Sequence, residues 1–262
     1  MGVSITFIEP TMRHALAGYG LSEYDDFINC RIGEPVSAVE PSQTRRLTFD
    51  ENGRKSHYYL KVYRYAAQRG RLRSRRDKAE QESRNYTYLR DVCRVRVPDV
   101  VCYGSRSQLW WRRDGFILTR GVAGAEPLDE FVRDRWPRAI DGLNNRERSE
   151  LLRASCELVR AMHAQHFYHL DLQWRNILVQ PPCHLFVIDS SKGRPHWAPL
   201  YRSHGQLRDV SSMTKEALNR LSRSERIRWL RNYLGRKRLQ KLDRMLIRAI
   251  EQDRILKDNT PR

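Results

Sequence analysis

Apolar and polar residues alternate in several short segments of the first half of the chain. Such alternation places successive side chains on opposite faces of a strand. It predicts strands at 35–39, 45–49 and 58–63, and further strands near 100–103 and 115–119. Glu51-Asn-Gly53 has the residue types of a tight turn, which predicts a hairpin. The first half should therefore form a small antiparallel sheet.

A helical period interrupts these strands at about residues 76–92. Ala79, Glu82, Tyr86 and Leu89 recur at steps of three and four, so they share one face of the predicted helix. A carboxylate on that apolar face, Glu82, would be costly to bury without a partner. Lys61 lies inside the strand at 58–63, and lysine is seldom buried unless it is paired. We predict that Lys61 and Glu82 pair; a lysine that reaches solvent from a sheet edge is the alternative.

The second half of the chain is predicted to be mainly helical, with helices at 147–165, 206–220, 223–234 and 236–256. Between the first two of these, short apolar runs flank Pro181-Pro182 and predict a hairpin that ends at Asp189. We expect one α+β domain over residues 1–262, with a small sheet lobe at about 25–120 and a larger, mainly helical lobe at about 121–256. Residues 1–24 form an uncertain N-terminal extension in this interpretation.

The segment His169-Leu-Asp171-Leu-Gln-Trp-Arg-Asn176 leads into that hairpin. It matches H-x-D-x-x-x-x-N, the catalytic-loop pattern of protein-kinase-like phosphotransferases. Asp171 would accept a proton from a hydroxyl nucleophile, and Asn176 would coordinate a magnesium ion on the phosphates of ATP. The hairpin would return Asp189 to the side of Asn176 as a second magnesium ligand. A strand-end or helix-capping role is the alternative for Asp189.

The order of these residues along the chain predicts a protein-kinase-like two-lobed fold. In such a fold Lys61 binds the ATP phosphates and Glu82 holds the lysine. The segment from Leu118 through Arg120 to Gly121 occupies the place of the hinge that offers backbone groups to adenine. His169 would brace the catalytic loop.

Two further side chains each have two explanations. Arg175 directly precedes Asn176, so it would either neutralise the transferred phosphate or face solvent. Asp209 would either hydrogen-bond the backbone of the catalytic loop, as a supporting residue, or cap the N-terminus of a helix.

The chain as a whole resembles the lipopolysaccharide core kinases, the group that contains the bacterial Kdo and heptose kinases. The resemblance rests on Tyr59-Leu-Lys61, Glu82-Ser-Arg-Asn-Tyr with Val97-Pro98, His169-x-Asp171 through Asn176, Val187-Ile-Asp189, Arg208-Asp209 and the basic segment from Ser224 to Tyr233. It covers about residues 25–255. It implies a kinase that uses ATP and Mg²⁺ to phosphorylate a heptose or Kdo hydroxyl of the lipopolysaccharide inner core.

Several features depart from a protein kinase. No G-x-G-x-x-G precedes Lys61, so the turn around Pro41-Ser-Gln-Thr44 would have to cover the triphosphate. Asp189-Ser-Ser stands in place of D-F-G, and no Ala-Pro-Glu precedes Asp209, so the segment that holds a peptide is missing. A glycolipid acceptor is therefore favoured. A protein or tyrosine kinase, and a pseudokinase-type protein that binds a membrane, are the alternatives.

The composition is strongly basic. The chain has 49 Lys and Arg residues and 31 Asp and Glu residues, which gives a net charge of +18. Only eight of the 49 are lysine, and arginine binds phosphate through two N–H groups at once. The basic runs at 64–78 and 220–248 therefore favour an anionic inner-membrane surface and an anionic glycolipid as partners, with solvated faces as the alternative. No recognised nucleic-acid-binding module accompanies the charge, so no nucleic acid partner is expected.

Cysteines and hydropathy bear on location. The five cysteines lack C-x-x-C spacing, which favours the reduced thiols of a cytoplasmic protein over zinc or disulfides. The chain contains no run of about 20 apolar residues, so no membrane span is predicted. Residues 1–19 lack the pattern of a signal peptide. The expected location is cytoplasmic, with peripheral binding to the inner face of the inner membrane.

Overall fold

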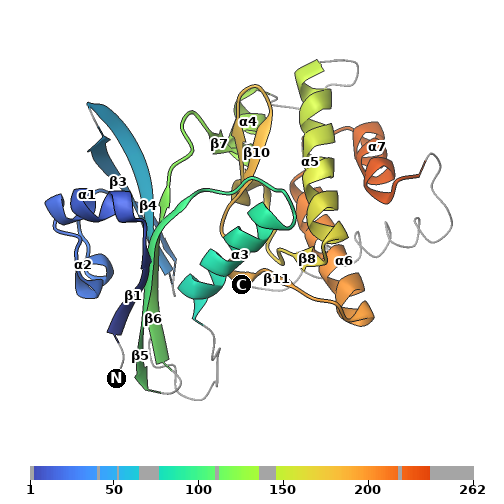
Figure 1. The fold of residues 1–262 in the computed structure, drawn as a ribbon. Helices are drawn as coiled ribbons and strands as arrows, with labels where there is room; N and C mark the ends of the chain where they lie inside the picture. The colour runs from blue at the N-terminus through green and yellow to red at the C-terminus, as the bar shows by residue number, and fades with distance from the viewer. Residues whose placement is uncertain are drawn as a thin grey trace. The chain divides into compact units, whose positions relative to one another are not determined.

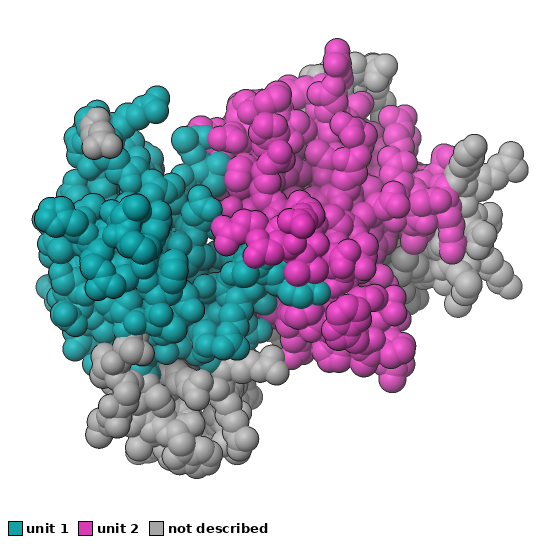
Figure 2. Space-filling view, viewed as in Figure 1, with its two compact units in different colours: residues 1–88, 98–123 teal, residues 89–97, 124–262 magenta. Residues whose placement is uncertain are grey.

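The computed structural model describes residues 3–39, 42–51, 53–64, 77–109, 112–135, 146–217 and 220–236. The chain forms two compact units, the first from residues 1–88 and 98–123 and the second from residues 89–97 and 124–262 (Figure 2). Most of the basic run at 64–78 and the helix predicted at 236–256 lie outside the described residues, as does Pro41 of the turn predicted to cover the triphosphate.

The first unit is built on an antiparallel sheet of six strands in the order β1-β5-β6-β4-β3-β2 (Figure 1). Its strands are β1 (Val3–Ile8), β2 (Glu34–Val39), β3 (Ser42–Glu51), β4 (Arg54–Tyr63), β5 (Val100–Leu109) and β6 (Arg112–Arg120). Each strand predicted from the alternating pattern is confirmed, and the observed strands are longer. The predicted turn lies between β3 and β4, where Gly53 has a φ of +80° that glycine adopts without strain.

Residues 3–24 belong to this unit. β1 pairs with β5 along an edge of the sheet, with Ile5 opposite Gly104. Next come η1 (Pro10–Met12), α1 (Arg13–Gly18) and α2 (Tyr24–Ile28), which lie on one face of the sheet (Figure 1). The ring of Phe27 stacks on Phe116 of β6 at 4.3 Å between centroids. The short helices carry too few residues to show a helical period, so the sequence pattern did not reveal them.

The helix α3 (Lys78–Asp91) covers the opposite face of the sheet (Figure 1). Its predicted inward face is confirmed, because Ala79, Glu82, Tyr86 and Leu89 are all buried. Asp77 begins the helix by accepting hydrogen bonds from the backbone N–H groups of residues 79 and 80, at 2.9 and 3.1 Å. The chain after α3 joins the second unit, where the carbonyl of Arg96 accepts the N–H of Val187.

The second unit is mainly helical, with short strands that carry its loops (Figure 1). Its elements are β7 (Glu126–Pro127), α4 (Leu128–Arg135), α5 (Arg146–Ala164), β8 (Phe167–Tyr168), η2 (Trp174–Asn176), β9 (Ile177–Gln180), β10 (His184–Val187), η3 (Ser190–Lys192), β11 (Arg194–Pro195), α6 (Pro199–Ala217) and α7 (Arg223–Leu234). The hairpin predicted around Pro181-Pro182 is confirmed as β9 and β10, with Ile177 opposite Val187. The helices predicted at 147–165 and 223–234 correspond to α5 and α7.

The helix predicted at 206–220 is wrong at its start, because α6 begins at Pro199. Proline is favoured in the first turn of a helix, where its missing N–H would have no helical acceptor. Gly205 lies inside α6 and lets the helix approach β8. A Cβ atom at this position would lie 2.4 Å from a ring carbon of Tyr168.

The five cysteines are free thiols, as the sequence predicted. Burial raises the pKa of Cys93 and Cys102 to about 12, so neither thiol ionises near neutral pH. No helix in the described part of the chain is both long and apolar enough to cross a bilayer.

Candidate active site

An ion pair joins the sheet of the first unit to its helix. Lys61 lies on β4 and Glu82 on α3, with 3.5 Å between Nζ and Oε2. The two side chains are only 15% and 2% exposed, so each charge needs the other to offset its loss of water. The ammonium group also lies 5.2 Å from the ring centroid of Tyr63. The structure thus brings together the two residues that the sequence predicted to pair.

Two tyrosines hold the carboxylate of this pair in place. The hydroxyl of Tyr63 donates to Oε2 of Glu82, and the hydroxyl of Tyr86 donates to Oε1 at 3.1 Å. Each carboxylate oxygen therefore has a fixed donor from a different element. A carboxylate held in this way fixes the lysine ammonium in turn, which is the arrangement that phosphate binding by a single lysine requires.

The positions predicted to contact adenine lie inside the sheet. Leu118 is paired with β4 on one side and β5 on the other. The N–H of Arg120 donates to the carbonyl of Asp99 at 2.9 Å, and its guanidinium forms an ion pair with Glu51 at 2.8 Å. The backbone N–H of Arg120 is therefore used within the sheet, and contact of these two positions with adenine stays a prediction.

In the second unit, Asp209 carries the start of the catalytic loop. Its carboxylate accepts the backbone N–H groups of His169 and Leu170 at 2.8 and 2.7 Å. Nε2 of His163 lies 3.2 Å from the same carboxylate. Leu170 has a φ of +65°, a conformation that non-glycine residues rarely adopt and that such bonds stabilise. Asp209 lies in the interior of α6, so its alternative as a helix cap is wrong.

His169 connects this loop to the segment before Asp189. The imidazole is fully buried, and its Nε2 lies 3.1 Å from the carbonyl oxygen of Ile188. The side chain therefore braces two chain segments that are nearly 20 residues apart. His169 therefore supports the catalytic loop through its contact with Ile188.

Asp171 has two side-chain partners. Nε2 of Gln173 donates to Oδ1 at 2.9 Å, and Nζ of Lys192 donates to Oδ2 at 2.6 Å. Burial would raise the pKa of Asp171, but the hydrogen bonds from Lys192 and Gln173 and the charge of Lys192 outweigh it and hold the pKa below its usual value. Asp171 is therefore ionised at neutral pH and has the charge that a proton acceptor needs.

Asn176 and Asp189 lie at the base of the β9–β10 hairpin. The side-chain Nδ2 of Asn176 donates to the backbone carbonyl of Asp171 at 2.8 Å, which leaves the amide oxygen as the end that could ligate a metal. The carbonyl of Asn176 accepts the N–H of Ile188, so Asp189 follows directly beside it. Among the described residues no group of three or more His, Cys, Asp or Glu residues could hold a metal ion. Two oxygen ligands fit Mg²⁺, which proteins commonly hold through one or two side chains together with substrate phosphates.

Arg175 lies on η2 directly before Asn176, and its role as the phosphate-neutralising cation stays a prediction. Its side chain is exposed, and its charge acts on Glu216 of α6. Burial raises the pKa of Glu216, while the backbone N–H of Trp174 and the charge of Arg175 partly oppose that shift. The cation in contact with Asp171 is Lys192.

One face of α6 holds the loop at three points. Beyond Asp209, the carbonyl of Met213 accepts the indole N–H of Trp174 at 2.9 Å. The carboxylate of Glu216 accepts the backbone N–H of Trp174 at 3.0 Å. These three α6 residues are spaced by four and three positions, so they lie along one side of the helix.

Comparison with known proteins decides the family. The model of the lipopolysaccharide kinase (Kdo/WaaP) family matches residues 31–233 of the chain. The chain belongs to this family. A sequence search of curated proteins found no match.

A solved structure described as WaaP in complex with acyl carrier protein has the same fold. The TM-score is 0.70 at 22% sequence identity, and the match covers 97% of this chain and 98% of that chain. The protein-kinase-like two-lobed α+β fold predicted from the sequence is therefore confirmed. As a member of the Kdo/WaaP family, the chain is a lipopolysaccharide kinase that phosphorylates a sugar hydroxyl.

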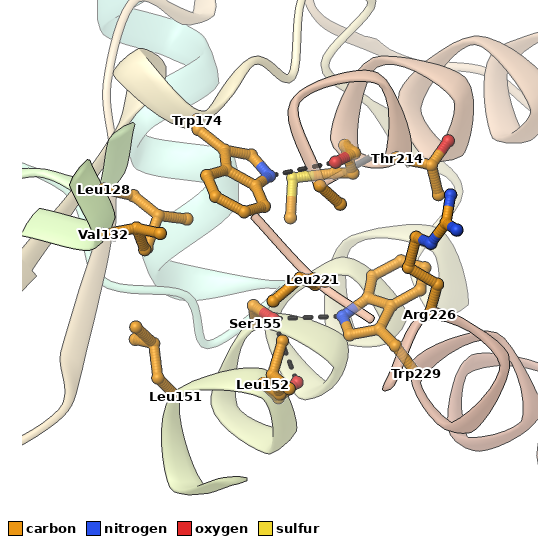
Figure 3. Close-up of a pocket in the computed structure, with 12 residues that line it drawn as sticks. Leu128, Val132, Leu151, Leu152, Ser155, Trp174, Thr214, Leu221, Arg226 and Trp229 are labelled. Atoms are coloured by element: carbon orange, nitrogen blue, oxygen red, sulfur yellow. Dashed lines mark hydrogen bonds between the residues drawn. The ribbon is translucent and has the colours of Figure 1, made fainter. Parts of the chain in front are cut away.

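This lipopolysaccharide kinase also has an apolar pocket that contains none of the predicted site residues. Figure 3 shows it among α4, α5, α6 and α7, with the rings of Trp174 and Trp229 in its wall. The indole N–H of Trp229 donates to Ser155 at 3.0 Å, so both tryptophans turn their polar atom to a partner and their rings to the pocket. The other lining residues are Leu128, Val132, Leu151, Leu152, Met213, Thr214, Ala217, Leu221 and Arg226.

Sequence reasoning missed Lys192, Gln173 and Glu216, which contact the catalytic loop. Gln173 lies inside the recognised motif but at a variable position. Lys192 follows Asp189 by three residues in a segment with no apolar period, and only the turn η3 brings it back to Asp171. Glu216 lies 40 residues beyond the motif, and its position on the inner face of α6 was the one available signal.

Proposed function

We propose that the protein transfers the γ-phosphate of ATP to a hydroxyl of heptose or Kdo in the lipopolysaccharide inner core. The observation that carries this proposal is the Asp171 carboxylate, held ionised beside Asn176 on a loop fixed by Asp209. An ionised, rigidly held carboxylate next to oxygen ligands for a metal is the arrangement that phosphoryl transfer to a hydroxyl requires.

Each residue has a defined part in the proposed reaction. Asp171 accepts the proton of the sugar hydroxyl as its oxygen attacks the γ-phosphorus. The bond from that phosphorus to the bridging oxygen breaks, and ADP leaves. Asn176 and Asp189 would hold Mg²⁺, which would neutralise charge on the phosphates. Lys61, held by Glu82, binds the phosphates and lowers their repulsion of the attacking oxygen.

The short segment after Asp189 supports a sugar acceptor over a protein. Only residues 190–198 lie between Asp189 and α6, and they include η3 and β11. A protein kinase uses a longer segment at this place to hold a peptide. The paired Lys61–Glu82 and the ionised Asp171 likewise favour an enzyme over a pseudokinase.

The charge of the protein supports a reaction at the cytoplasmic face of the inner membrane. The net charge of +18 favours contact with anionic lipid headgroups and with a phosphorylated glycolipid. In α7, Arg223 and Arg228 are exposed and available for such contacts. We place the protein in the cytoplasm, in peripheral contact with that membrane.

An acyl carrier protein is proposed as a protein partner, from the complex in which WaaP was solved. The apolar pocket of Figure 3 would accept the end of an acyl chain carried by such a partner. Binding measured with the acylated and the unacylated carrier protein tests this. Tighter binding of the acylated form supports both the partner and the role of the pocket. Equal affinity for the two forms supports the partner but rejects the pocket, and no binding of either form rejects both.

The first experiment uses γ-labelled ATP, Mg²⁺ and core lipopolysaccharide from which phosphate has been removed. The wild-type protein should label the glycolipid, and Asp171→Asn should lower the rate by about three orders of magnitude or more while its thermal unfolding stays unchanged. Asp134→Asn, at an exposed position, serves as the matched control. Label on added protein and none on glycolipid would instead establish a protein kinase. ATP binding without transfer to either acceptor would establish a pseudokinase.

A further inference from the structure

A lysine is paired with one carboxylate oxygen of Asp171. Nζ of Lys192 lies 2.6 Å from Oδ2, and the lysine side chain is 52% exposed while that of Asp171 is 17% exposed. The ammonium group is therefore at the surface end of the site, and the carboxylate is at the inner end.

The backbone around Lys192 is fixed although its side chain is half exposed. Asp189 adopts a left-handed conformation with a φ of 54° and begins η3. The hydroxyl of Ser191 donates to the carboxylate of Asp189 at 3.3 Å. Gly193 then lies so close to β8 that a Cβ atom would be 2.7 Å from the ring of Phe167. The turn therefore fixes the backbone of Lys192 relative to Asp189 and β8, while the side chain remains free to rotate.

The ion pair has little value as a device for stability. A pair that includes a half-exposed lysine contributes little to folding, because water screens it and ordering the long side chain costs entropy. For the chemistry, a permanent pair would be unfavourable, since the ammonium group covers one of the two oxygens that could accept the proton. A lysine has a flexible stem and can move its charge by several bond rotations. These properties fit a charge that leaves Asp171 during the reaction.

We propose that Lys192 is a catalytic residue that moves from Asp171 to the transferred phosphoryl group. Before the acceptor binds, it holds the Asp171 carboxylate in place. As the hydroxyl arrives, the ammonium group passes to a non-bridging oxygen of the γ-phosphate and uncovers Oδ2. This inference rests on the proposed phosphoryl transfer, and it gives Lys192 the part that the sequence suggested for Arg175.

The balance of the step is simple. The oxygen of the acceptor forms a bond to the γ-phosphorus, the bond to the bridging oxygen of ATP breaks, and the proton of the acceptor goes to Asp171. Lys192 keeps its proton throughout and supplies charge only. Its effect should therefore appear in the rate of transfer, where charge on the phosphoryl oxygens is largest, more than in the binding of ATP.

The test compares Lys192→Met and Lys192→Arg with Lys55→Met, which removes an equal charge from an exposed position on β4. We expect kcat of Lys192→Met to fall about a hundredfold or more, with KM for ATP within about threefold of wild type. Arginine should restore at least about a tenth of the wild-type rate because it keeps the charge. Thermal unfolding of all three variants should match that of wild type.

Three outcomes would overturn the inference: a kcat of Lys192→Met within about threefold of wild type, a loss found wholly in KM for ATP, or no rescue by arginine. The same variants are also assayed for ADP release with water as the acceptor. If the wild type labels no glycolipid, the proposed function fails. In that case the rate of ADP release still tests the role of Lys192: a lower rate in Lys192→Met supports the inference, and an unchanged rate overturns it.

Discussion

The attachment of Asp209 to the catalytic loop yields a sharp prediction. Asp209→Asn keeps the size of the side chain but replaces one carboxylate oxygen with an NH₂ group. In the wild-type protein, the carboxylate of Asp209 accepts the N–H of His169 at Oδ2 and the N–H of Leu170 at Oδ1. In the variant, one of these two N–H groups must face another donor.

The magnitude follows from the lost hydrogen bond. A hydrogen bond to a charged acceptor contributes about 1.5–3 kcal/mol, and the remaining bond is weakened because the acceptor is now neutral. At 1.36 kcal/mol per factor of ten, local opening of the loop should become about tenfold to about 150-fold more frequent. The left-handed conformation of Leu170 adds to the effect, because it would relax once it is released.

Amide hydrogen exchange of a peptide that spans residues 167–172 measures this opening directly. Exchange in Asp209→Asn should accelerate by the stated factor, and kcat should fall with little change in KM for ATP. Asp134→Asn is the control, because the exposed pair of Asp134 with Arg133 contributes little. Exchange within about twofold of wild type would refute the argument that Asp209 holds the loop.

Further predictions concern other contacts. Glu225→Gln should lower the free energy of unfolding by about 3–5 kcal/mol in chemical denaturation, because it breaks the mostly buried pair with Arg148. Burial raises the pKa of Glu225, but the hydrogen bonds from Arg148 and Ser222 and the charge of Arg148 outweigh it and lower the pKa. This stabilisation is therefore complete above the unfolded pKa of about 4.3 and is lost as pH falls through the folded pKa, so acid should narrow the difference in stability between variant and wild type. Lys61→Met should lower kcat/KM for ATP about a hundredfold in the glycolipid assay. It should also lower the unfolding temperature, because it leaves the buried carboxylate of Glu82 without its cation, so activity is measured well below that temperature. Gly205→Ala should cost about 1–3 kcal/mol by overpacking, whereas Gly18→Ala, where a Cβ meets nothing within 4 Å, should not destabilise the protein.

Local patterns predicted much of the fold because they reflect local physics. The shared face of Ala79, Glu82, Tyr86 and Leu89 follows from the helical period alone, and the hairpin that ends at Asp189 follows from two apolar runs and a turn. The start of α6 was not predicted, and Gly205 inside it makes a close approach to Tyr168, 37 positions away. Such a role leaves no local pattern.

Some residues of the candidate site could likewise be predicted from the sequence, and others could not. The motif from His169 to Asn176 identified the loop, and the pairing of Lys61 with Glu82 followed from the cost of buried charge. Lys192 could not be found, because its contact depends on backbone dihedral angles in η3 that its neighbours in sequence do not specify. Residues 118–121 were predicted to form the link that contacts adenine. In the structure, β6 continues to Arg120 and lies between β5 and β4, which the local pattern did not predict.

The three α6 residues that hold the catalytic loop limit how this protein can change in evolution or by design. Each added residue turns a helix by about 100°, so a single insertion between positions 209 and 213 would direct the later contacts away from the loop. A deletion would have the same effect. Substitutions at exposed positions of the loop, in contrast, leave the three attachments unchanged. Acceptor specificity can therefore diverge by substitution, while the length of this part of α6 must stay constant.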